Sequence, residues 1–323
     1  MPEKNASFLQ TLAPKNLWGL LVTTFNEWLE DKAPQLGAAL SYYTVFSLAP
    51  LVLVLLAIIG MIFRKDPSGA WNKITEQMSY VLDPSGVQVV QEIAKTAAKP
   101  SASLLATIIG IALALFGASG VFGQLQDALN TIWGVKAKPG GAIWAFIRVR
   151  FLSFAMVGGI CFLLLVSLAI EALLKAFSHY VQQALPGGLA IALTIYLVFD
   201  LAVVILLFGM MFKYLPDVEV RWRDVIVGAA MTAILFLIGK WAMGLYLGSG
   251  AAGSAYGAAS SLVTLLLWIY YSSQILLFGA EFTQVYANRF GAGGKPSKHA
   301  VCIERTEEVV SKRGQLPPDR AKS

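Results

Sequence analysis

Six long apolar stretches constrain the fold of this chain more than any other feature. Each has about 20 residues or more, the length that an α-helix needs to cross a hydrocarbon layer about 30 Å thick. The stretches cover residues 36–63, 104–123, 151–173, 189–212, 225–247 and 260–282. The chain is 57% hydrophobic and only 14% charged, whereas soluble domains average about 25% charged residues. The sequence therefore predicts a membrane protein.

The character of these stretches selects helices. Backbone groups in lipid must find partners within the protein, so only helices or a closed barrel can span a membrane. Barrel strands alternate apolar and polar residues, but these stretches are continuously apolar. The predicted fold class is all-α: a polytopic membrane protein with six transmembrane helices, amphipathic interfacial helices and a small extracytoplasmic helical cap.

The distribution of charge predicts an orientation and a domain plan. Lys and Arg number about 18 on the side of the two termini and about 6 on the other side, which places both termini in the cytoplasm. We expect a cytoplasmic and interfacial segment over 1–35, a transmembrane domain over 36–288 with the cap at 64–103, and a disordered cytoplasmic tail over 289–323. The basic excess indicates topology and contact with anionic lipid. No nucleic-acid partner is predicted, because no basic module with aromatic residues accompanies it.

Segments outside the apolar stretches have helical periodicity. Residues 16–31 place five apolar side chains on one face (Trp18, Leu21, Val22, Phe25 and Leu29), which predicts a helix along the inner leaflet. A helix packed at the start of the first span is an equal alternative. Two patterns, at 71–81 and 87–98, predict the cap, and residues 124–133 predict an amphipathic helix with Asn130 on its polar face.

The first predicted span is unusually polar in its first half. Ser41, Thr44 and Ser47 recur every three residues and Tyr43 precedes Ser47 by four, so hydroxyls follow one flank of the helix. Pro50 lacks a backbone N–H and is expected to bend the helix. Two interpretations remain open: the flank lines a polar pathway, or the hydroxyls bond carbonyls one turn back in a packed helix.

Two ionisable residues fall deep within predicted spans. Asp200 lies in the fourth and Lys240 in the fifth, and each costs about 2.5–3.5 kcal/mol to insert at the centre of a membrane helix. Their depths from the cytoplasmic ends are similar, at about 18 Å and 22 Å for a rise of 1.5 Å per residue. We therefore expect a buried Asp200–Lys240 pair that serves as a transport or coupling site. The alternatives are a salt bridge that fixes helix register, or a Lys240 side chain that extends outward to the membrane surface.

Most enzyme chemistry finds no support in the sequence. The two histidines, His179 and His299, are predicted on opposite sides of the membrane, and no HExxH or CxxC motif occurs. The phosphate-binding motif GxxxxGK[ST] and the hydrolase motif GxSxG are also absent from the sequence. We predict no catalytic residues, no metal site and no cofactor.

Several segments resemble one protein family. The sequence DKAPQLGAALSYYTVFSLAP over residues 31–50 is similar to the first-span signature of the YihY/BrkB family of bacterial inner-membrane proteins. Supporting similarities are ALNTIW at 128–133, YLP at 214–216, RWRD at 221–224, YG at 256–257 and LFGAE at 277–281. The resemblance covers roughly residues 15–290. It carries over no active site, so the roles of Asp200 and Lys240 depend on the residues alone.

The resemblance implies a six-helix inner-membrane protein. Members of the family are described as transporters, with lipid export suggested for some, and many carry the label ribonuclease BN, against which the missing metal ligands argue here. The leading hypothesis is a non-ATP-driven transporter or exporter of a lipid or small amphiphile. The alternative is a non-enzymatic membrane scaffold for envelope integrity or serum resistance. Membrane lipids are the expected partners, and small-residue ridges allow a homo-oligomer without requiring one.

Overall fold

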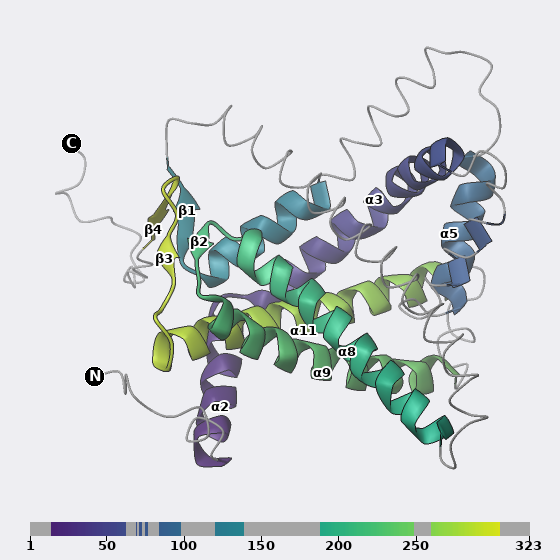
Figure 1. The fold of residues 1–323 in the computed structure, drawn as a ribbon. Coiled ribbons are helices and arrows are strands. Elements are labelled where there is room, and N and C mark those ends of the chain that lie inside the picture. The colour runs from purple at the N-terminus through teal and green to yellow at the C-terminus, as the bar shows by residue number, and fades with distance from the viewer. Residues whose placement is uncertain are drawn as a thin grey trace, which may run out of the picture.

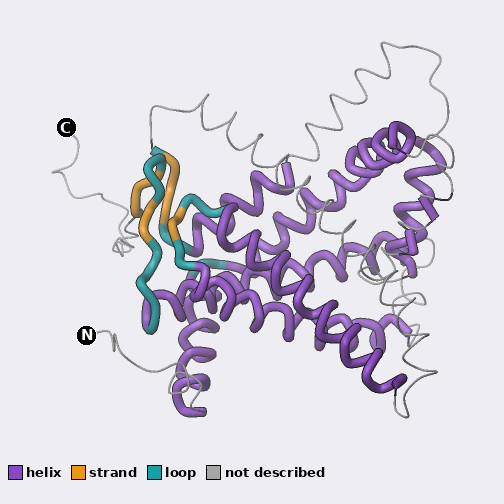
Figure 2. Tube along the Cα trace, viewed as in Figure 1, coloured by secondary structure: helices purple, strands orange, loops and turns teal. Residues whose placement is uncertain are grey.

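The structure is a computed structural model, drawn in Figures 1 and 2, that describes residues 14–62, 69, 71–72, 75–76, 84–97, 120–138, 188–248 and 260–303. Helices dominate the described part and confirm a mostly helical fold. The labelled helices are α2 (Pro14–Glu30), α3 (Ala33–Ile62), α5 (Pro84–Ala97), α8 (Gly188–Tyr214), α9 (Trp222–Gly248) and α11 (Ser260–Arg289). Residues 120–132 are also helical. The strands are β1 (Val135–Ala137), β2 (Val218–Glu219), β3 (Lys295–Pro296) and β4 (Ala300–Cys302).

Three of the described helices are long and apolar enough to cross a membrane: Leu197–Tyr214, Trp222–Leu245 and Leu262–Arg289. They correspond to the fourth, fifth and sixth predicted spans. Helix α3 covers the first predicted span. The second predicted span lies mostly outside the described residues and the third lies wholly outside them. Six crossings therefore stay a prediction.

Helix α11 organises the bundle. It packs against α9, α3, α2 and α5, and α8 packs against α9. Leu265, Leu277 and Ala280 of α11 are fully buried or nearly so, whereas α9 keeps large apolar side chains such as Ile238 and Trp241 exposed. An apolar surface of this kind suits lipid. The second half of α11 is thus the more buried part of the bundle, while α9 and the first half of α11, with Leu262 and Leu266, carry outward apolar side chains.

A reciprocal glycine–threonine crossing joins α9 to α11. A Cβ atom on Gly228 of α9 would lie 2.7 Å from Cβ of Thr283 on α11, and a Cβ on Gly279 of α11 would lie 2.8 Å from Cβ of Thr232 on α9. Each threonine hydroxyl donates to the glycine carbonyl one turn earlier in its own helix, at 2.7 Å in both cases. Small residues therefore let the two backbones approach closely, and no hydroxyl is left unsatisfied at the crossing.

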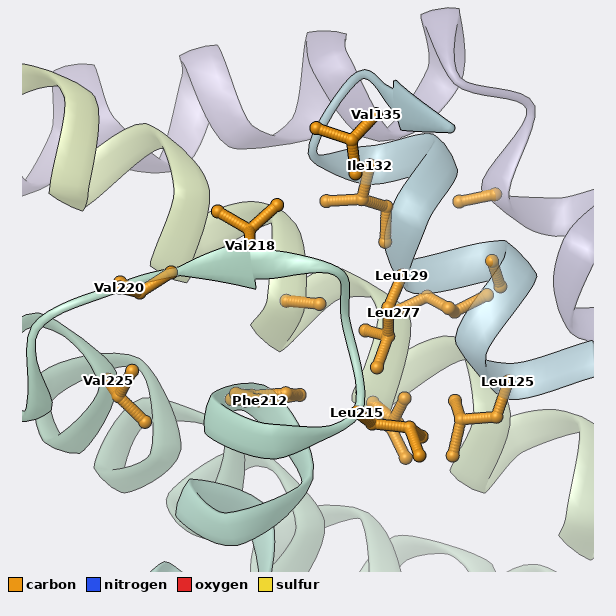
Figure 3. Packing of buried hydrophobic residues seen from close by; sticks show 14 of the residues in the cluster. Leu125, Leu129, Ile132, Val135, Phe212, Leu215, Val218, Val220, Val225 and Leu277 are labelled. Carbon is orange, nitrogen blue, oxygen red and sulfur yellow. The ribbon is translucent and has the colours of Figure 1, made fainter. Parts of the chain in front are cut away.

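The strands close one end of the bundle, which we call the strand end. β1 pairs antiparallel with β4, and β2 pairs antiparallel with β3. Beneath them lies a buried apolar cluster that includes Leu129, Ile132, Phe212, Leu215 and Leu277, and Figure 3 shows side chains from separate elements meeting there. The strand end thus gathers segments that are distant in the sequence into one core.

The prediction of a disordered tail from residue 289 is wrong for its first part. Residues 295–302 supply β3 and β4, and the Ile303 amide donates to the Gly134 carbonyl at 2.8 Å. Composition alone suggested disorder, but backbone pairing with β1 and β2 and burial of Ala300 give this segment a fixed place. Residues 304–323 lie outside the described part.

Both predicted amphipathic segments near the first span are helical. In α2, Leu20 and Thr24 are buried, and α2 packs on α11. In α5, Val90 and Ala94 are buried, and α5 packs on α3 and α11. Most of the rest of the expected cap, over 64–103, lies outside the described residues, so the cap as a whole stays a prediction.

Candidate functional site

The hydroxyl flank of α3 is engaged with its own helix. Ser41 donates to the Gly37 carbonyl at 2.7 Å, Thr44 donates to the Leu40 carbonyl at 2.7 Å, and Ser47 donates to the Thr44 carbonyl at 2.9 Å. These bonds have the geometry that the packing alternative expected. Ser41 and Ser47 are buried, so the flank faces protein.

The other two candidate residues of α3, Tyr43 and Pro50, do not share the hydrogen bonds of the hydroxyl flank. Tyr43 is exposed, and its ring makes an edge contact with Tyr42 at 5.9 Å between centroids. Pro50 lies within α3, whose helical backbone continues through it to Ile62. The side chain of Pro50 lies outside the described part of the structure. A gating role for this proline stays a prediction.

Asp200 and Lys240 lie on neighbouring helices. Asp200 belongs to α8 and Lys240 to α9, and these two helices pack together as expected of consecutive spans. Lys240 is half-buried, while the placement of the Asp200 side chain lies outside the described part. The ion pair between them therefore stays a prediction, now restricted to two helices in contact.

A different carboxylate is buried inside a candidate span. Glu281 of α11 is only 1% exposed and is among the largest fully buried side chains of the described chain. It lies within the candidate span Leu262–Arg289. Ionisable side chains at such positions are costly and usually functional. In the sequence, Glu281 lies one residue before the end of the last apolar stretch, 260–282, and closes the LFGAE similarity at 277–281.

The neighbours of Glu281 come from α2 and α3. Gln274, Glu281 and Val285 follow one another at seven and four residues in α11, so they share a helix face. Val285 belongs to the same buried cluster as Leu20 of α2, and the Gln274 amide donates to the Pro34 carbonyl at 3.4 Å. Glu281 therefore lies between these contacts, on the face of α11 that meets α2 and the start of α3.

Buried polar atoms occur on both helices that pack here, in Thr24 and Trp28 of α2 and in Gln274 and Glu281 of α11, and we call this region the α2–α11 junction. Thr24 and Trp28 follow Leu20 at four-residue steps on α2. Thr24 Oγ1, Trp28 Nε1 and Gln274 Oε1 are buried and have no hydrogen-bond partner within the described structure. An unpaired buried polar atom costs about 1–3 kcal/mol, so a small polar molecule or water at the junction would stabilise it.

A second polar cluster fastens the strand end. Asp217 Oδ2 accepts from Asn130 Nδ2 at 3.1 Å and from Gln126 Nε2 at 3.3 Å. The Asp217 amide donates to Asn130 Oδ1 at 2.7 Å. All three residues are buried, so Asn130 is not on a solvent-facing side of its helix as the amphipathic pattern indicated. Asp217 thus binds two side chains that precede it in the sequence by 87 residues (Asn130) and 91 residues (Gln126).

Asp127 lies next to this cluster. Burial raises the pKa of the Asp127 carboxyl above its ordinary value of 3.8, and the negative charge of Asp217 raises it further. The Asp127 side chain is still exposed in part. The electrostatic setting of the strand end is therefore a buried aspartate held by amide donors, with a second aspartate whose charged form is disfavoured.

The described residues contain no cluster of metal-binding side chains. Within those ranges, no group of three or more His, Cys, Asp or Glu residues could hold a metal ion. Buried Asp224 is occupied with the backbone of the chain that follows α11, where Oδ2 accepts from the Ala292 amide at 3.4 Å. The two polar regions of interest are thus the α2–α11 junction and the Asp217 cluster.

Comparison with known proteins identifies the family. The model of the virulence factor BrkB family matches residues 24–303. The chain belongs to the virulence factor BrkB family. This range contains α3, α8, α9 and α11 and all four strands, so both polar regions fall largely within the family's shared part. The expected resemblance is confirmed.

Relatives are known as membrane proteins. The chain is 29% identical over 275 residues to a UPF0761 membrane protein of Alcanivorax borkumensis, covering 84% of this chain and 60% of the relative. It is 27% identical over 282 residues to one of Tolumonas auensis, covering 82% and 86%. A third, from a Psychrobacter species, is 30% identical over 268 residues, covering 79% and 46%. The chain thus spans less than two thirds of the first and third relatives. No solved structure matches it.

Proposed function

We propose that this BrkB-family membrane protein moves a lipid or small amphiphile across the bacterial inner membrane without ATP, with both termini in the cytoplasm. The observation that carries the proposal is Glu281, a carboxyl side chain 1% exposed inside a candidate span. Gln274 Oε1 on the same face of α11, and Thr24 Oγ1 and Trp28 Nε1 on α2, are buried polar atoms that would bind water or a polar head group. The α2–α11 junction is therefore the proposed polar part of the pathway.

The flank of Ser41, Thr44 and Ser47 takes a different role in this proposal. Their hydroxyls donate to carbonyls of α3, so a passing polar group would have to compete with bonds already made. We assign them to packing of α3 beside α11. The Asp200–Lys240 pair remains a candidate coupling site, because α8 and α9 are in contact.

The test is movement of a fluorescent phosphatidylglycerol across vesicles that contain the purified full chain and no ATP. We expect wild-type protein to expose the labelled lipid to an external reductant faster than empty vesicles do. Glu281→Gln keeps the size of the side chain but replaces its ionisable carboxyl with a neutral amide, and should abolish most of this acceleration. The matched control is Glu219→Gln, because Glu219 is an exposed carboxyl of β2. Equal rates for wild type and Glu281→Gln would contradict the proposal.

Two further variants separate the candidate sites. If Asp200→Asn or Lys240→Met abolishes lipid movement while Glu281→Gln does not, the coupling site lies between α8 and α9. Deletion of residues 304–323 should leave movement intact. Deletion from residue 294 would be a poor control, because it removes β3 and β4.

The second candidate function is a membrane scaffold for envelope integrity or serum resistance. The observation in its favour is that many hydrogen bonds hold the strand end together: β1 pairs with β4, β2 pairs with β3, and the Asp217 cluster lies in the same region. Such a surface could bind a partner without any movement of substrate. If Glu281→Gln, Asp200→Asn and Lys240→Met all leave the cellular phenotype intact while exposed residues of the strand end do not tolerate change, the scaffold is the better account.

A further inference from the structure

Helix α2 has three distinct faces. One packs on α11 through Leu20 and Thr24. A second carries polar residues, of which Thr23, Asn26 and Glu30 are exposed. The third is apolar and exposed, and consists of Trp18, Val22, Phe25 and Leu29, which we call the α2 stripe. Its exposed fractions are 71%, 44%, 51% and 50% respectively. A helix that only supported the bundle would need no such third face.

The spacing of the stripe is that of a continuous helix face. Its members lie four, three and four residues apart, which keeps them aligned at 3.6 residues per turn. At 100° per residue, Glu27 lies almost opposite the centre of the stripe. The pKa of the Glu27 carboxyl is raised by burial and by the charges of Glu30 and Asp31. The acidic residues of α2 are thus directed away from the stripe.

The direction of α2 matches a position at a membrane surface. In Figure 1, α2 runs across α11 at the strand end instead of alongside it. Two described residues, Asp31 and Lys32, connect α2 to α3, and Lys32 has a φ of 55°. This turn fixes a sharp change of direction. If α11 crosses the membrane, α2 lies in the plane of the bilayer.

Other residues mark the water boundary at the same end. The candidate span of α8 ends at Tyr214 and that of α9 begins at Trp222. Their exposed rings pack edge to face at 5.8 Å between centroids, and aromatic pairs of this kind are typical of the membrane–water interface. Arg221 and Arg223 are exposed on either side of Trp222. The Lys213 ammonium group, which precedes Tyr214, donates to the Val220 carbonyl.

From these placements we propose that α2 is an in-plane membrane helix. The α2 stripe lies among the acyl chains of the leaflet at the strand end, and Arg221 and Arg223 contact the phosphates of anionic lipids in that leaflet. Charge complementarity indicates that a lipid surface covers the α2 stripe. The arginines match anionic head groups, and the carboxylates of α2 point away from the stripe. The inference does not depend on transport, since a scaffold would be anchored in the same way.

Spin labels on α2 test the position of the stripe. In full-length protein with Cys161→Ser and Cys302→Ser, one nitroxide is attached at Val22→Cys and, as the matched control, another at Thr23→Cys, an exposed position 100° further round the helix. The protein is reconstituted in vesicles of phosphatidylethanolamine and phosphatidylglycerol. We expect the ratio of collisions with oxygen to collisions with a water-soluble nickel complex to be several-fold higher at position 22 than at position 23.

Three results would overturn the proposal. Equal ratios at the two positions would mean that the stripe does not face lipid. Low collision with both reagents at position 22 would mean that another segment of the chain covers it. Dipolar broadening between labels at position 22 of two molecules, lost on dilution with unlabelled protein, would mean that a second copy is the occupant.

The arginine contact has its own test. Raising the phosphatidylglycerol content of the vesicles should raise the thermal midpoint of the wild-type protein. Arg221→Gln with Arg223→Gln should lose most of that shift. Lys295→Gln with Lys298→Gln is the control, because these exposed lysines lie on and beside β3 instead of at the end of a candidate span. An equal loss in both pairs would show a general charge effect and would refute a specific contact.

Discussion

The α9–α11 crossing and the strand end are held together by different kinds of contact. At the crossing, Gly228 and Gly279 each accommodate a threonine of the other helix, and every hydrogen bond of the threonines is local. At the strand end, Asp217 binds two side chains from a helix 87 and 91 residues away. The crossing therefore depends on shape, and the strand end depends on polar groups whose partners are far away in the sequence.

This difference predicts that the two regions respond to opposite kinds of substitution. Adding volume should damage the crossing, where no space is available. Removing a polar group should damage the strand end, where its partners would remain buried without a substitute. Each variant below is designed to break or sharpen that contrast.

The largest effect is expected for Gly228→Leu. The new side chain would overlap Thr283 of α11, and overpacking typically costs about 1–3 kcal/mol, so we expect a value at the upper end of that range. Thermal unfolding of the purified protein in one detergent measures it. Gly244→Ala is the control, because no atom lies within 4 Å of a Cβ there. A Gly228→Leu protein as stable as the wild type would disprove the close crossing.

Asp217→Ala should have the next largest effect. The amides of Asn130 and Gln126 would lose their acceptor while buried, at a cost of about 2 kcal/mol. Glu219 lies two residues after Asp217 and its side chain is exposed, so Glu219→Ala should change the free energy of unfolding little. A double-mutant cycle between Asp217→Ala and Asn130→Ala isolates the pair. Simple additivity of the two single effects would show that the bond contributes no stability.

Truncation separates the ordered from the undescribed part of the tail. Ending the chain after residue 303 keeps β3 and β4, and we expect an unchanged thermal midpoint. Ending it after residue 293 removes both strands and uncovers Trp133 and Val218, which contact Gly294. Exposure of those side chains should cost about 1–2 kcal/mol. Two truncations of equal stability would contradict the pairing of β1 with β4 and β2 with β3.

Asp127 should produce the smallest effect, and its sign depends on pH. Its pKa is raised in the folded protein, so folding favours the protonated carboxyl. The favourable contribution is complete below the ordinary pKa of aspartate and is lost as pH rises through the raised pKa. In the Asp127→Asn variant the free energy of unfolding should therefore fall less as pH rises through that window. The difference from the wild type should be about half a kcal/mol or less, because solvent screens the group. A steeper decline in the variant would reverse the assigned sign.

The sequence predicts local features of this protein well. Continuous apolar stretches located both ends of α8 and α9 and the start of α11 to within three residues, because lipid-spanning helices have a strict length requirement. Helix α11 continues for seven residues beyond the predicted end at 282. Periodicity found the helix at 16–31 and the buried face of α5, where Val90 and Ala94 are four residues apart. These features depend only on residues close together in the chain.

Contacts between distant segments could not be predicted in the same way. Asn130 has the spacing of a solvent-facing residue, and only the position of Asp217 explains why it is buried. Residues 295–302 have the composition of a disordered tail, yet strands β1 and β2 provide partners for their backbone. Glu281 is buried on the face of α11 that carries Val285, and Val285 packs in one cluster with Leu20 of α2. In each case the decisive partner is far away in the sequence.

The central claim is that the strand end lies on the cytoplasmic side of a membrane crossed by α8, α9 and α11. Cys302 tests it directly, since its thiol is free and exposed on β4. In a Cys161→Ser background, a membrane-impermeant maleimide is added to intact spheroplasts and to permeabilised ones. We predict labelling of Cys302 only after permeabilisation. Equal labelling in intact spheroplasts would place the strand end outside the cell and contradict the account.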